Sequence, residues 1–144
     1  MATINVYLNF MGNTEEAFNF YRFVFGGEFE GGINRFKDTP HGDKLSVTDK
    51  EKIMHVALPV GNGNVLMGTD LLESSGHKLI AGNNYSISIN ADSKEEADNF
   101  FTKLSEGGKI EMPIADTFWG AYFGMFADKF GIQWMVNFDY NQKK

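Results

Sequence analysis

Residues 15–21 read EEAFNFY, and residues 95–101 read EEADNFF. Glu, Glu, Ala, Asn and Phe recur in the same order, and each copy is followed by a glycine pair, at 26–27 and at 107–108. A repeat of this kind indicates that one structural unit occurs twice in the chain. We therefore expect two helices with glutamates in the first turn and a glycine stop at the end.

An alternating segment precedes each of these helices. Residues 4–10 and residues 85–90 both alternate apolar with polar or aromatic side chains. This period of two predicts a half-buried strand in each case. The side chains expected on the face away from the core are Asn5, Tyr7, Asn9, Ser86, Ser88 and Asn90. Between strand and helix, Asn13 or Thr14 can cap the first helix, and Asp92 or Ser93 can cap the second.

Three more strands are predicted after each helix. In the first half they cover residues 28–37, 53–60 and 64–69, with a polar surface loop at 38–52 and a Gly-Asn-Gly hairpin turn at 61–63. In the second half they cover residues 109–114, 118–127 and 132–138. Pro113 favours an edge position or a strand end. Each half therefore reads strand, helix, strand, strand, strand.

Composition excludes several classes of function. The 144 residues carry a formal net charge of −6 without a basic stripe, which argues against nucleic-acid binding. The absence of cysteine rules out disulfides, cysteine nucleophiles and thiolate metal sites. No apolar run is long enough for a transmembrane helix, and no signal peptide is visible. A cytoplasmic location is expected.

Short motifs spread over nearly the whole chain carry a resemblance to a known family. They are YLNF at 7–10, GN at 12–13, IMH at 53–55, LMG at 66–68, GGK at 107–109, TFWG at 117–120, DKFG at 128–131 and WM at 134–135. With these motifs the sequence resembles the PhnB-like branch of the vicinal oxygen chelate superfamily. That superfamily includes glyoxalase I, extradiol dioxygenases and bleomycin-resistance proteins.

The resemblance implies a single α+β domain over residues 1–144. It would contain two tandem βαβββ modules, at about 1–70 and about 84–138, joined by a connector at about 71–83. In such proteins the curved sheets surround a concave cup that holds the site, and two chains usually form a homodimer. The metal-dependent relatives take His, Gln or Glu ligands from four strand positions, two in each module.

Those four ligand positions carry over to residues that bind divalent metals poorly. They fall near Asn5, Met67, Ser86 and Met135 in this sequence. Zinc and nickel sites use imidazole or carboxylate, and neutral thioethers with an amide and a hydroxyl would leave a dication's charge uncompensated. We therefore expect no metal site and no other cofactor.

The same resemblance predicts a ligand-binding cup. Its candidate residues are Asn5, Tyr7, Asn9, His55, Met67, Ser86, Ser88, Trp119, Tyr122 and Met135. Uncharged hydrogen-bonding groups among methionine and aromatic side chains suit a small organic ligand. Structural explanations stay open: the polar strand residues could simply be solvated, and Trp119 and Tyr122 could pack in the core or at a dimer contact.

Among these candidates, His55 has the side chain that could take part in proton transfer. It could point into the cup and act as a ligand-binding group or as a proton acceptor, or it could be a partly buried histidine with one satisfied hydrogen bond. The sequence thus favours a PhnB-like protein that binds a small organic ligand without the standard metal site. The alternative is a diverged lyase, isomerase or other enzyme of the same superfamily, so whether the chain catalyses a reaction stays open.

Overall fold

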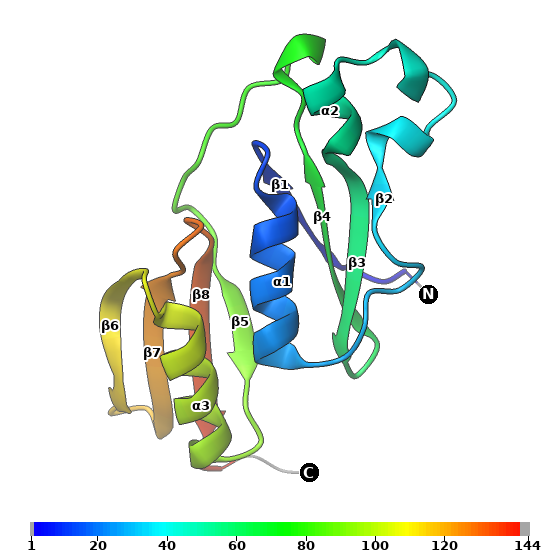
Figure 1. The fold of residues 1–144 in the computed structure, drawn as a ribbon. Helices are drawn as coiled ribbons and strands as arrows, with labels where there is room; N and C mark the ends of the chain where they lie inside the picture. The colour runs from blue at the N-terminus through cyan, green and yellow to red at the C-terminus, as the bar shows by residue number, and fades with distance from the viewer. Residues whose placement is uncertain (1, 142–144) are drawn as a thin grey trace. The chain divides into compact units, whose positions relative to one another are not determined.

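The structure is a computed structural model that describes residues 2–141, and its chain divides into two compact units at Ile80 and Ala81. Each unit holds one four-stranded sheet and one long helix (Figure 1). The strand orders are β1-β4-β3-β2 in the first unit and β5-β8-β7-β6 in the second. Among the described residues, no helix is long and apolar enough to cross a membrane.

The first unit follows the predicted order of one helix and four strands. These elements are β1 (Val6–Phe10), α1 (Thr14–Phe25), β2 (Asn34–Arg35), β3 (Ile53–Gly61) and β4 (Asn64–Asp70). Strand β1 pairs with β4 in parallel, and the other pairs are antiparallel. The β3–β4 hairpin turns at Asn62, whose φ of 52° lies in the left-handed region that asparagine tolerates.

The second unit repeats this order. Its elements are β5 (Ile87–Asn90), α3 (Lys94–Ser105), β6 (Lys109–Asp116), β7 (Ala121–Ala127) and β8 (Gln133–Asp139). Strand β5 pairs with β8 in parallel, and Pro113 lies in the edge strand β6 as predicted. The two βαβββ modules confirm the α+β fold expected from the repeat.

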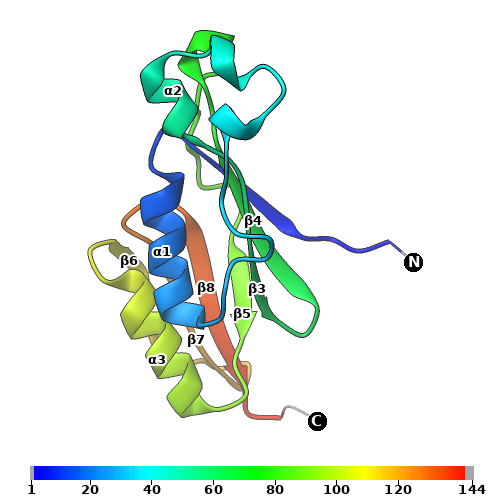
Figure 2. The same ribbon diagram turned by 45° about the vertical axis from the view of Figure 1, so that its right-hand side comes forward.

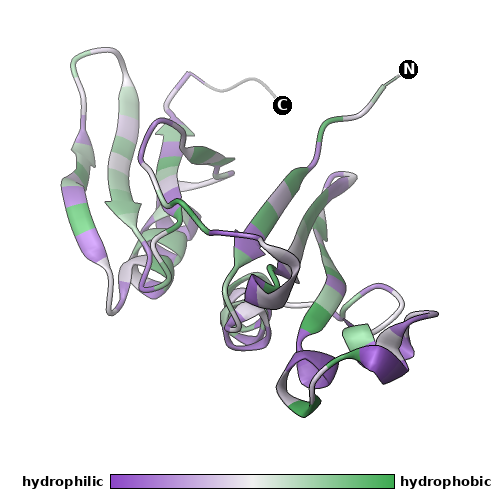
Figure 3. Ribbon diagram, turned by 90° about the horizontal axis from the view of Figure 1, so that it is seen from above, coloured by the Kyte–Doolittle hydropathy of each residue, from purple (hydrophilic) through white to green (hydrophobic). Residues whose placement is uncertain are grey.

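Each helix packs on one face of its own sheet (Figure 2). Helix α1 buries Ala17, Phe18, Tyr21 and Val24, and α3 buries Ala97, Phe101 and Leu104. The sheet residues beneath them are equally buried, among them Leu58 in β3 and Trp134 in β8. Hydrophobic and hydrophilic bands alternate along the strands in Figure 3. One face of each sheet is therefore core, and the other carries no helix of its own module.

Three predicted segments differ from the structure. The strand expected at 28–37 is reduced to Asn34–Arg35, because Gly31 and Gly32 both adopt positive φ. The loop expected at 38–52 contains η1 (Phe36–Asp38, which begins before it), η2 (Gly42–Lys44) and α2 (Val47–Glu51). A further 3₁₀ turn, η3 (Glu73–Ser75), lies in the connector.

The starts of β1 and β7 also differ from the prediction. Ile4 was expected on the core face of the first strand, but it precedes β1 and is 95% exposed. Residues 118–120 were expected in a strand, but β7 begins only at Ala121. Gly120 has φ +87°, so the backbone turns there instead of extending.

Candidate functional site

The register of the first sheet gathers polar and aromatic side chains on its helix-free face. Tyr7 lies opposite Met67, and Met67 lies opposite Ala57. Directly opposed residues of neighbouring strands share a face, and so do residues two apart along a strand. The side chains placed on this face are Tyr7, Asn9, Asn34, His55, Met67 and Thr69. Four of these six were predicted from sequence.

Tyr7 and His55 are in direct contact on this face. The Tyr7 hydroxyl lies 3.2 Å from Nδ1 of His55, and the ring centroids are 5.8 Å apart. The two residues come from β1 and β3, which are separated in the sheet by β4. A hydrogen bond at Nδ1 restricts the ring orientation, so the chemistry of His55 toward a ligand rests on Nε2. The Tyr7 hydroxyl donates to Nδ1 or accepts from Nδ1–H according to the tautomer.

Two residues of this face were missed by sequence reasoning. Thr69 follows Met67 at the spacing of two that places both on one face, so the alternation of the return strand could have revealed it. Its hydroxyl donates to the backbone oxygen of Met54 at 2.7 Å. Asn34 lies opposite His55 in a two-residue strand, for which the sequence carries little signal.

Asn5 has a different role from the one expected. It precedes β1, and its side-chain oxygen accepts a hydrogen bond of 3.2 Å from the backbone N–H of Val65. This bond extends the β1–β4 pairing by one contact. Asn5 thus lies beyond the end of β1 in the structure.

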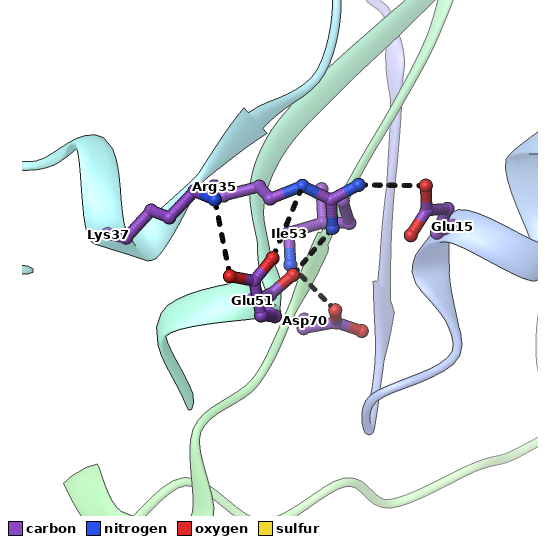
Figure 4. Close-up of polar contacts among 6 residues, drawn as sticks. All are labelled: Glu15, Arg35, Lys37, Glu51, Ile53 and Asp70. Carbon is purple, nitrogen blue, oxygen red and sulfur yellow. Dashed lines mark hydrogen bonds and ion pairs between the residues drawn. The ribbon is translucent and has the colours of Figure 1, made fainter. Parts of the chain in front are cut away.

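An ion-pair network holds the edge of the first sheet next to Asn34 (Figure 4). Arg35 pairs with Glu15 of α1 at 2.8 Å and donates to the backbone oxygen of Glu51 at 2.6 Å. Lys37 pairs with Glu51 at 3.2 Å. The hydrogen bond to Glu15 is the main cause that raises the pKa of Arg35. The network ties β2 to α1 and α2, and so fixes the position of Asn34.

The helix-free face of the second sheet carries two rows of uncharged side chains. One row runs across β5, β8 and β7 and consists of Ser88, Met135 and Met125. The next row includes Asn90, Asn137 and Phe123, and the Asn137 amide donates to the Asn90 side chain at 3.4 Å. The structure therefore brings the predicted Ser88 and Met135 together. Ser86 precedes β5.

Trp119 lies beside this second face. Its ring centroid is 5.8 Å from that of Phe123 and 5.1 Å from that of Phe118, in edge-to-face geometry. Trp119 is 54% exposed, and Phe118 is 97% exposed. Trp119 was expected to wall a ligand cavity, to pack in the core or to lie at a dimer contact, and its exposure disfavours the core.

Tyr122 lies on the opposite face from the one that a cup residue would need. Its hydroxyl donates to Asp98 of α3 at 2.5 Å, and the Lys94 ammonium lies 4.7 Å from the ring centroid. The hydrogen bond to Asp98, helped by partial burial, raises the pKa of Tyr122 to about 12. Strand alternation explains the difference, since Tyr122 shares its face with Gly124 and Phe126 beneath α3.

The side chains on the two helix-free faces do not fit a divalent metal. They offer one imidazole, several amides and hydroxyls, and thioethers, whereas zinc and nickel sites need more imidazole or carboxylate. Within residues 2–141, no group of three or more His, Asp or Glu side chains is placed to hold a metal ion.

Comparisons with known proteins agree with the fold. Residues 3–136 match the profile of the Glyoxalase/Bleomycin resistance protein/Dioxygenase superfamily. Protein YjdN of Escherichia coli (strain K12) is 31% identical over 140 residues, which cover 93% of either chain. Protein PA1353 from Pseudomonas aeruginosa is a solved structure with 42% identity and a TM-score of 0.84, over 96% of this chain and 98% of that one. A PhnB protein from Bacillus cereus has 28% identity and a TM-score of 0.75, over 95% and 99%.

Proposed function

This chain belongs to the Glyoxalase/Bleomycin resistance protein/Dioxygenase superfamily, and from that premise we propose that it binds a small organic molecule without the standard divalent-metal site. The observation that carries the proposal is the Tyr7–His55 contact on an uncharged, helix-free sheet face. The proposal includes no cofactor, no nucleic acid and no membrane as partner.

The chemistry of the first face supports a particular kind of ligand. Tyr7 and His55 offer flat rings with polar edges, Met67 offers an adaptable apolar surface, and Asn9 and Asn34 offer amides. Ligand sites combine an apolar lining with a few placed polar groups. A small molecule with an apolar body and one or two hydrogen-bonding atoms matches this set. Arg35 and Lys37, which could have met an anion, are already paired with glutamates.

Thermal shifts test the binding proposal. A ligand that binds the folded state raises the melting temperature by mass action, so a panel of small aromatics, dicarbonyls and phosphonates can be screened without assuming a reaction. A hit is expected to lose its shift in His55→Ala and to lose part of it in Tyr7→Phe. His41→Ala, in an exposed loop turn, is the matched control. A shift that survives His55→Ala unchanged would remove His55 from the site.

The Tyr7–His55 contact also favours a second candidate, a diverged lyase or isomerase with His55 as general base. In the tautomer whose Nδ1–H donates to the Tyr7 hydroxyl, Nε2 is unprotonated and would accept a proton from a bound substrate. Turnover that disappears in His55→Gln would support the enzyme. Metal analysis of the purified protein tests whether a divalent metal is bound. Stoichiometric zinc, nickel or iron that is lost on mutating a residue of either helix-free face would contradict the metal-free site.

A further inference from the structure

His55 lies next to an irregularity of strand β3. In the pairing of β2 with β3, Asn34 lies opposite His55 and Arg35 lies opposite Ile53. One step along β2 thus corresponds to two steps along β3, and Met54 is the extra residue of a β-bulge. A bulge bends its strand and re-aims the side chains beside it. The direction of the His55 imidazole therefore depends on how this bulge is held.

The Thr69 side chain of β4 bonds to the bulge. The regular β3–β4 pairing runs from the hairpin to the pair of Val56 with Gly68, which is the position next to His55. One residue further along β4, the Thr69 hydroxyl donates to the backbone oxygen of Met54 at 2.7 Å. An extra residue in a strand has no regular partner in the ladder, so its carbonyl needs another donor. Thr69 supplies that donor.

The second module shows the same sheet without this bulge. Asn9 and Asn90 occupy matching places in the repeat, and they lie opposite Thr69 and Asn137 respectively. Asn137 is therefore the counterpart of Thr69. Here β7 and β8 stay paired without a register shift, and Phe123 lies directly opposite Asn137. Of the two modules, the one with the histidine has the bulge in its third strand.

We propose that Thr69 is a positioning residue for His55. Its hydroxyl holds the carbonyl of Met54, and the bulge held in this way directs the imidazole toward Tyr7. The role of this geometry in binding rests on the proposed function, but the Tyr7–His55 contact can be measured in the protein without a ligand.

NMR of the histidine rings tests the positioning role. The chain has three histidines, so the ring ¹⁵N signals of His55 can be compared with those of His41 and His77 in the same spectrum. Thr69→Val removes the hydroxyl and keeps the branched shape. In this variant we expect the His55 ring signals to shift and the nuclear Overhauser contact between the His55 and Tyr7 rings to be lost. The signals of the other two histidines should not change.

Two further variants separate the hydroxyl from general packing. Thr69→Ser keeps the hydroxyl and should retain the wild-type His55 signals. Thr48→Val makes the same substitution at an exposed position of α2 and should also leave them unchanged. If circular dichroism shows that Thr69→Val does not fold, Thr69→Ala removes the hydroxyl with the same readout.

Two results would overturn the positioning role of Thr69. The first is a folded Thr69→Val or Thr69→Ala protein with unchanged His55 ring signals and an unchanged contact to Tyr7. The second is a shift in Thr69→Ser as large as in Thr69→Val, because the hydroxyl is then not the cause. A ligand screen without hits would contradict the proposed function instead, and the NMR comparison would still decide the role of Thr69.

Discussion

At the scale of single residues, buried aspartates join the parts of each module. The Asp70 carboxylate at the end of β4 accepts hydrogen bonds from Gly12 N–H, Thr14 N–H, the Thr14 hydroxyl and Ile53 N–H, at 2.6–3.1 Å. It thereby holds the start of α1 and the start of β3 together. In the second module, Asp128 accepts from the backbone of Phe130 and Ile132 and from the Trp134 indole. Neither role could be predicted from sequence, because the partners are distant or depend on the turn geometry.

Asp70→Ala is expected to destabilise the protein by about 3 kcal/mol or more, because it leaves several buried donors without an acceptor. Asp43→Ala removes an exposed aspartate of η2 and should change stability by only about 0.5 kcal/mol. Urea unfolding followed by circular dichroism measures both. An Asp70→Ala protein as stable as Asp43→Ala would show that the four bonds contribute little.

Tyr122 gives the protein an alkaline pH dependence. Its pKa is raised to about 12 by the Asp98 hydrogen bond, whereas in the unfolded chain it is about 10. The contribution to stability is therefore complete below pH 10 and is lost as the pH rises toward 12. Asp98→Asn removes the negative charge, so it should lower the Tyr122 pKa in a spectrophotometric titration. Tyr122→Phe should remove this titration step, and a step that remains would belong to another tyrosine.

At the scale of elements, the two repeated helices begin differently. Ser93 accepts from the Glu96 N–H at 3.0 Å, and the Glu96 carboxylate accepts from the Asp92 N–H at 3.0 Å. This reciprocal arrangement resembles a capping box. Asn13 occupies the N-cap of α1 without a side-chain cap bond, and Asp70 serves the first turn instead. The sequence predicted both helices. It could not show that the N-terminus of α1 is capped by Asp70, a residue distant in the sequence.

Removal of the two N-cap side chains should therefore have unequal effects. Ser93→Ala is expected to cost about 1 kcal/mol of stability, because it leaves the Glu96 N–H without its acceptor. Asn13→Ala should cost less, since no cap bond of its side chain is lost. Thermal melts of the two variants under identical conditions make the comparison. Equal destabilisation would contradict the difference between the helix starts.

At the scale of the whole molecule, the sequence predicted the fold better than the site. Periodicity and glycine stops identified both helices and most strands, since these signals are local. Residues 28–37 failed because their glycines interrupt a strand that tertiary pairing keeps only at Asn34–Arg35. On the site, alternation placed Tyr7 and Asn9 on one face and the family resemblance added Met67, but neither could show that Tyr7 reaches His55 across an intervening strand.

A homodimer is our prediction for the assembled protein, on the basis of the family it belongs to. Light scattering coupled to size exclusion is expected to give twice the chain mass of 16.2 kDa at micromolar concentration. For such a dimer the melting temperature should rise with protein concentration, because association stabilises the folded state. A mass of one chain at all concentrations would contradict the prediction.

The parallel pairs β1–β4 and β5–β8 also bear on how the protein is made. The first and last strands of each module are neighbours, so Val6 pairs with Leu66 and Ile87 pairs with Trp134. A chain leaves the ribosome from its N-terminus, and long-range pairs form late because their loops must close first. During translation, β1 and β5 therefore stay without these pairing partners until β4 and β8 have emerged from the ribosome. Neither sheet is complete before then.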